Sequence, residues 1–170
     1  ASQKFSADWG VRIVPSDSPL YDPAGYHAGS IWPLFTCWVS LAEFASDRPC
    51  QGFVHAMNNL LLSRHWSAGH VPEVLHGERM DPAGVCAHQA WSEAMVLLPL
   101  LEGMLGFHAD APDRSVALRP YFPPDWQRAE VRNLRVGRST FSMTMRRRMN
   151  TTSFIFSTVS RVPLTIDFRP

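Results

Sequence analysis

Apolar residues recur at helical spacing in three segments of the first 106 residues. A helix is expected over residues 30–46, where Ser30 is a suitable N-cap and Pro33 falls in the first turn. A second is expected over residues 50–65, packed antiparallel to the first. A third is expected over residues 85–106, with Pro99 kinking it without ending it.

The segments around these helices lack helical periodicity. The first thirty residues and residues 67–84 are rich in glycine, proline and polar side chains, which favours long ordered loops. After residue 110 the pattern becomes β-rich, and strands are expected at 116–120, 131–136, 140–145, 153–156 and 164–168. Residues 136–140 indicate a hairpin turn, so this part should form an antiparallel sheet or sandwich. The pattern predicts a mainly α part over residues 1–110, followed by a β-rich part over residues 111–170.

Composition narrows the classes of partner. The 170-residue chain is 45% hydrophobic and 18% charged with a net charge of +1, which argues against nucleic acid as a partner. No segment approaches the roughly 20 apolar residues of a membrane helix, so no membrane partner is expected. Its three cysteines form no CxxC pair, which predicts reduced, buried thiols. The expected location is cytoplasmic. Because it begins with Ala1 and ends while still strand-like, we expect a fragment of a longer protein.

Aromatic and carboxylate residues near the helix ends suit a carbohydrate site. Sugar faces stack on aromatic rings, and sugar hydroxyls need fixed donors and acceptors. Candidate aromatic residues at element ends are Tyr21, Tyr26, Trp32, Trp66 and Trp91, although a core role is equally open for each alone. Glu73 follows Pro72 in an apolar stretch, where a carboxylate must be used or paired. The alternative for Glu73 is a loop glutamate held by Arg64 or Arg79, and the alternative for Glu93 is a role on the helix surface or in helix packing.

Histidines raise the question of a metal. His27, His70, His76 and His88 show no HxxxH or HxH spacing and no soft-ligand cluster, so neither a metal nor another cofactor is predicted. Hydrogen bonds to sugar hydroxyls or to a catalytic carboxylate are a better use of these imidazoles, and ordinary loop packing remains an alternative.

Four segments, taken in order and spacing, resemble the carboxyl-terminal part of amylo-α-1,6-glucosidases of the glycogen-debranching type. They read DWGVR at residues 8–12, YDPAGYHAGSIWP at 21–33, VPEVLHG at 71–77 and AHQAWSEA at 87–94. The resemblance covers residues 8–108, and the β-rich remainder is similar to the strand-rich appendage that follows the barrel in that family.

This resemblance implies a partial (α/α)6 toroid built from helical hairpins, and an inverting glycoside hydrolase acting on α-glucans or oligosaccharides. It assigns the general base to Glu73. The residues expected to bind sugar are Tyr26, His27, Trp32, His88, Gln89 and Trp91.

The resemblance also implies what the chain lacks. The general acid is expected in an earlier loop, and the chain has about half the helices of a closed toroid. We therefore expect little or no hydrolase activity from the chain alone, and expect the rest of the barrel or a partner chain to cover its apolar face. Two alternatives stay open: a non-catalytic carbohydrate-binding or scaffold protein, and a structural helical module without a ligand.

Overall fold

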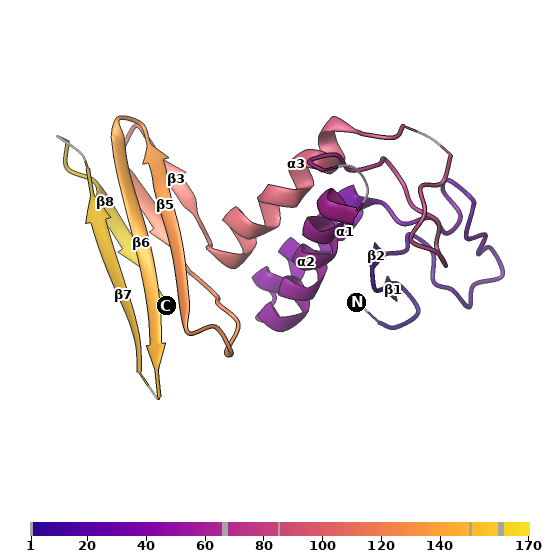
Figure 1. Ribbon diagram of the computed structural model, residues 1–170, viewed down its shortest axis with the longest axis horizontal. Helices are drawn as coiled ribbons and strands as arrows, with labels where there is room; N and C mark the ends of the chain where they lie inside the picture. Colours follow the sequence, from indigo (N-terminus) through magenta and orange to yellow (C-terminus); the bar gives the residue numbers. More distant parts are fainter. Residues whose placement is uncertain (1, 66–67, 85, 150, 160–161) are drawn as a thin grey trace. The chain divides into compact units, whose positions relative to one another are not determined.

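The computed structural model describes residues 2–65, 68–84, 86–149, 151–159 and 162–170. The chain divides into two compact units, Ala1–Met104 and Leu105–Pro170. The first holds the helices and the second holds most of the strands (Figure 1). Among the described residues, no helix is both long and apolar enough to cross a membrane.

The predicted fold class is wrong. The described residues form three α-helices and three small sheets, with 28% helix and 29% strand, so the fold is mixed α/β and not a mainly α toroid. The physical reason is that residues 2–32, 68–84 and 86–89 are largely loop and occupy much of the first unit, and their prolines and glycines exclude helix.

The helices themselves lie close to the predicted segments. They are α1 (Pro33–Ala45), α2 (Pro49–His65) and α3 (Ala90–Leu98), and the chain continues from α3 into a π-helical segment, η1 (Pro99–Met104). The hydrogen bonding changes from α to π at Pro99, which has no N–H to donate. The helix nevertheless continues past the proline, as predicted. The N-cap of α1 is Trp32 and not the predicted Ser30.

Helices α1 and α2 pack antiparallel, as predicted. Asn59 Nδ2, late in α2, donates to the carbonyl of Pro33 at the start of α1 over 2.8 Å. Ser40 Oγ, further along α1, donates over 2.6 Å to the carbonyl of Gly52, early in α2. These polar pairs are buried, so they fix the register of the two helices.

The core of the first unit joins the loops to the helices. A buried cluster brings together side chains from α2, α3 and both long loops: Ile31, Leu62, Val71, Leu75 and Val96. Two short strands, β1 (Ser6–Ala7) and β2 (Gly10–Val11), form a hairpin beside it. Isolated β-bridges then connect Arg12 to Ile31, Ile31 to Leu75, and Leu75 to Pro82. The loops are therefore fixed to one another by backbone bonds.

The described residues of the second unit form two three-stranded sheets. One has the order β3 (His108–Asp110), β4 (Ser115–Leu118), β8 (Thr165–Phe168), and its β4–β8 pair is parallel, contrary to the all-antiparallel expectation. The other is an antiparallel meander of β5 (Arg128–Val136), β6 (Ser139–Arg148) and β7 (Thr151–Thr158). Its first turn lies at the predicted hairpin, where Gly137 has φ +57°.

Candidate active site

The loop that carries Glu73 is held by backbone hydrogen bonds along its length. Glu73 N donates to the carbonyl of Cys86 over 3.1 Å, and Leu75 exchanges bonds of 2.9 and 2.8 Å with Ile31. Gly77 N donates to the carbonyl of Pro23 over 2.8 Å. The side chains of Val71, Val74 and Leu75 are buried. Glu73 therefore has a fixed position although it belongs to no helix or strand.

Tyr26 holds the Glu73 carboxylate. The tyrosine hydroxyl donates to Glu73 Oε1 over 2.7 Å. Glu73 is 8% exposed and Tyr26 is 37% exposed, so the pair lies at the edge of the core. The pKa of Tyr26 is raised above its usual value, mainly because its hydrogen bond to the carboxylate stabilises the protonated phenol. Among the described residues no other donor contacts this carboxylate, which leaves Oε2 available to a water molecule.

Aromatic rings surround Tyr26. Its ring meets those of His27 and Trp32 edge-on, with centroid separations of 4.6 Å in both cases. The exposed ring of His27 stacks on Trp32 at 5.7 Å with an interplanar angle of 9°. Trp32 is 5% exposed, and its Nε1 donates to the carbonyl of Tyr26 over 3.1 Å. The buried Trp32 therefore packs against the inner side of this loop, whereas His27 and Tyr26 are exposed to solvent.

The remaining predicted sugar-binding residues lie at the start of α3. Gln89 caps this helix, because its Oε1 accepts from Ala90 N over 3.1 Å. Trp91 is 43% exposed. His88 contacts His70 and Glu93, and within the described residues no contact joins His88, Gln89 or Trp91 to Tyr26 or to the Glu73 carboxylate. The predicted sugar-binding residues therefore form two separate groups, one around Tyr26 and one at the start of α3. The candidate Trp66 lies outside the described residues.

The alternative roles for the two glutamates have different outcomes. Arg79 pairs with Asp81 over 3.3 Å, and among the described residues neither it nor Arg64 forms an ion pair with Glu73. The interpretation of Glu73 as a loop residue held by arginine is therefore not what the structure shows. Glu93 Oε1 lies 3.1 Å from His70 Nδ1, within hydrogen-bond distance, and 3.8 Å from His88 Nδ1, so Glu93 does not pack only against neighbouring helices.

The sequence did not predict a buried pair that Glu43 forms with His55. His55 Nδ1 lies 2.6 Å from Glu43 Oε2, and both side chains are about 95% buried between α1 and α2. Burial alone would raise the pKa of Glu43, but hydrogen bonds to its carboxylate, that from His55 among them, bring the pKa below its usual 4.5. Helical spacing could have indicated that Glu43 is buried, because it falls on the face of α1 that also carries Pro33, Thr36, Cys37 and Ser40.

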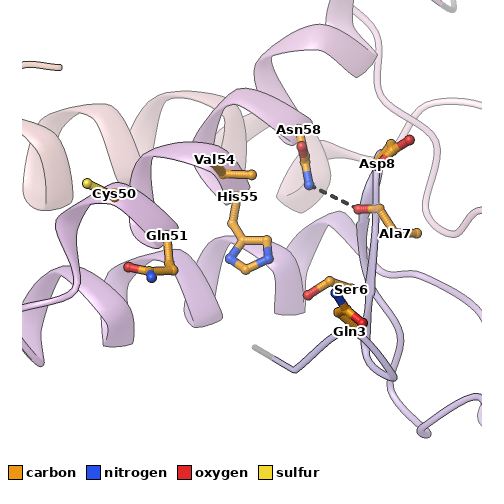
Figure 2. A pocket seen from close by; sticks show the side chains of 9 residues that line it. All are labelled: Gln3, Ser6, Ala7, Asp8, Cys50, Gln51, Val54, His55 and Asn58. Atoms are coloured by element: carbon orange, nitrogen blue, oxygen red, sulfur yellow. Dashed lines mark hydrogen bonds between the residues drawn. The ribbon is translucent and has the colours of Figure 1, made fainter. Parts of the chain in front are cut away.

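His55 also lines a cavity of about 560 Å³ between α2 and the first residues of the chain (Figure 2). Its described lining residues are Gln3, Ser6, Ala7, Asp8, Cys50, Gln51, Val54, His55 and Asn58. Asn58 Nδ2 lies 3.4 Å from the carbonyl oxygen of Ala7, a contact that Figure 2 shows between α2 and β1. None of the predicted site residues lines this cavity, so its size alone does not mark it as the place where Glu73 acts.

No protein-family model matches the chain. No curated protein matches its sequence either. The resemblance to amylo-α-1,6-glucosidases therefore rests on the four sequence segments alone.

Proposed function

We propose that Glu73 is the general base of a glycoside hydrolase that acts on α-glucans or oligosaccharides with inversion of configuration. The observation that supports this most is a carboxylate only 8% exposed, on a loop fixed by backbone bonds, with one oxygen held by Tyr26. Inverting hydrolysis needs such a base to activate water on the face of the sugar opposite the leaving group. The resemblance of residues 71–77 to the family segment points to the same residue.

The geometry around Glu73 suits this role. Because Tyr26 occupies Oε1, the carboxylate cannot rotate freely, and Oε2 is left to accept a proton from water. The exposed rings of Tyr26 and His27 offer surfaces on which a sugar can stack. Trp32 holds both rings in place from the buried side. The proposal concerns this local arrangement and does not depend on a closed helical toroid.

A general acid is not assigned. Asp22 is engaged in a local turn, where its Oδ1 accepts from Ala24 N over 3.0 Å, and Asp8 lines the cavity beside His55. A test of the base should therefore use a substrate whose leaving group needs no proton. α-Glucosyl fluoride is suitable, because fluoride departs without general acid catalysis and only water has to be activated.

The experiment compares fluoride release by the wild-type chain, Glu73→Gln and the matched control Glu78→Gln, an exposed glutamate on the same loop. We expect Glu73→Gln to slow the reaction by about 100- to 10,000-fold, the usual contribution of a general base, and Glu78→Gln to leave it unchanged. NMR should show β-glucose as the first product. Equal rates for wild type and Glu73→Gln, or α-glucose as the first product, would contradict the proposal.

A non-catalytic carbohydrate-binding protein is the second candidate. It is favoured by the exposed aromatic side chains of the first unit, since Trp38 is 51% and Trp91 is 43% exposed. Titration with maltooligosaccharides, followed by tryptophan fluorescence, separates the two candidates. Saturable binding without fluoride release supports the second candidate, and the absence of both binding and fluoride release excludes both.

A further inference from the structure

Two histidines and a glutamate converge beside the start of α3. His70 Nδ1 lies 3.1 Å from Glu93 Oε1, and His88 Nδ1 lies 3.8 Å from the same oxygen. The ligand atoms of the three side chains all lie within 4.8 Å of one another. His70 and Glu93 are 23 positions apart in the sequence, so no short spacing motif could have revealed the group.

The backbone fixes this arrangement. Gln89 N donates to the carbonyl of Val71 over 2.9 Å, which holds the segment that carries His88 against the segment that carries His70. Glu93 N donates to the carbonyl of Gln89 over 3.0 Å, which places Glu93 one helical turn beyond that pairing. The ring centroids of the two histidines are 4.8 Å apart. The group is thus built on paired backbone and a helix, and does not depend on long free loops.

The spacing matches a metal site. With Zn–N and Zn–O bonds of 2.0–2.2 Å, a tetrahedral zinc ion separates neighbouring ligand atoms by roughly 3.3–3.6 Å. The two measured distances to Glu93 Oε1, 3.1 and 3.8 Å, lie on either side of this value. Small side-chain rotations would therefore bring all three ligand atoms to bonding distance of a single ion.

The chemistry and exposure of the ligands agree with this geometry. Two imidazoles and one carboxylate form a ligand set that binds zinc and similar divalent transition metals, and three protein ligands leave a fourth position for water. The side chains of His70, His88 and Glu93 are 48%, 67% and 32% exposed, so an ion can enter directly from solvent.

We propose that His70, His88 and Glu93 bind a divalent transition-metal ion, with Zn²⁺ as the best match. The ion is bound by His70, directly before Val71, and by Glu93 in the first turn of α3. It therefore connects the segment that leads to Glu73 with that helix. The inference does not rest on the proposed hydrolase function, since it concerns other side chains.

The test is titration of the full chain with Zn²⁺ by isothermal calorimetry. We expect one equivalent to bind to the wild type, and His70→Ala and His88→Ala each to weaken binding by about tenfold or more. Loss of a residue that only orients a metal ligand already weakens binding 10- to 100-fold, and loss of a ligand should do at least as much. Glu93→Gln should weaken binding as well. His108→Ala, which removes an exposed histidine in β3, is the matched control and should bind as the wild type does.

Two further measurements distinguish this site from binding by a nearby thiol and from misfolding of the variants. Cys86 Sγ lies 2.7 Å from the carbonyl of His88, so Cys86→Ser tests whether this thiol binds the ion instead. We expect this variant to retain binding, and the Co²⁺-substituted wild type to lack a thiolate charge-transfer band. Circular dichroism without metal should show each variant folded as the wild type is. The proposal is overturned if the wild type binds no Zn²⁺, if both histidine variants bind it as tightly as the wild type, or if Cys86→Ser abolishes binding.

Discussion

Tyr26 and Glu73 are 47 positions apart in the sequence, yet a single hydrogen bond joins them. The sequence indicates Glu73 as a candidate site residue, because a carboxylate in an apolar run needs a use or a partner. It selected Tyr26 from the resemblance, as a sugar contact, and gave no reason to place the hydroxyl on the carboxylate. That contact depends on the pairing of Ile31 with Leu75, which the local sequence pattern does not reveal.

The titration of Tyr26 provides a test of this contact that does not involve catalysis. The pKa of Tyr26 is raised above its usual 10.0, first by its hydrogen bond to Glu73 and then by burial and by repulsion between tyrosinate and carboxylate. Glu73→Gln removes the charge, so we expect the pKa to fall toward 10.0. Tyrosinate absorbance measures this change, and Tyr26→Phe identifies the transition. Glu78→Gln, the control, should leave it unchanged, whereas an unchanged transition in Glu73→Gln would show that the contact is absent in solution.

At the scale of elements, periodicity located the helices but not the buried face of α1. Of the apolar residues in α1, Leu34, Phe35 and Leu41 are only partly buried and Trp38 is exposed. The structure instead buries the face that carries Thr36, Cys37, Ser40 and Glu43, and leaves Trp38 51% exposed. The reason is that α2 supplies polar partners to this face, namely His55 for Glu43 and the carbonyl of Gly52 for Ser40. A hydrophobicity pattern cannot anticipate partners contributed by another element.

The Glu43–His55 pair leads to a prediction about stability and pH. The folded pKa of Glu43 lies below its usual 4.5, so its contribution is fully present above about pH 4.5 and is lost as pH falls through the folded value. We expect Glu43→Gln to reduce the free energy of unfolding by about 1–3 kcal/mol at pH 7, because a buried charged hydrogen bond is lost. The difference from the wild type should shrink below pH 4.5.

Urea unfolding at several pH values measures this difference. Glu102→Gln, which changes an exposed glutamate of η1, is the control and should alter the free energy of unfolding by no more than about 0.5 kcal/mol at any pH. A difference for Glu43→Gln that stays constant from pH 7 to pH 3 would show that the charge of the Glu43 carboxylate does not contribute to stability.

At the scale of the whole molecule, the sequence predicted the change from helices to strands but not the fold class. Periodicity correctly indicated β5, β6 and their hairpin, since each element shows its own alternation of residues. The toroid was inferred from a resemblance of short segments, and such segments do not specify how many helices pack together. The parallel pairing of β4 with β8 was missed for a similar reason, because the two strands are distant in the sequence.

The division into two units predicts how fragments behave. Residues 1–104 have a buried cluster around Ile31 and Leu75, while residues 105–170 bury side chains such as Phe141, Met143 and Met145. Since each unit has a core of its own, we expect both to fold when produced separately. Circular dichroism should show helix in the first fragment and strand in the second, each with a cooperative thermal transition. A second fragment without such a transition would show that it needs the first.

The loop beyond Glu73 has a narrow base, because His76 N donates to the carbonyl of Asp81 over 2.8 Å. The chain therefore leaves and re-enters the folded unit at nearly one point, and the tip between, with Glu78, Arg79 and Met80, is exposed. Extra residues at this tip would lengthen it without moving Glu73. Over evolution, insertions and deletions are better tolerated there than in residues 71–76, and an engineer could attach a peptide tag at the same point.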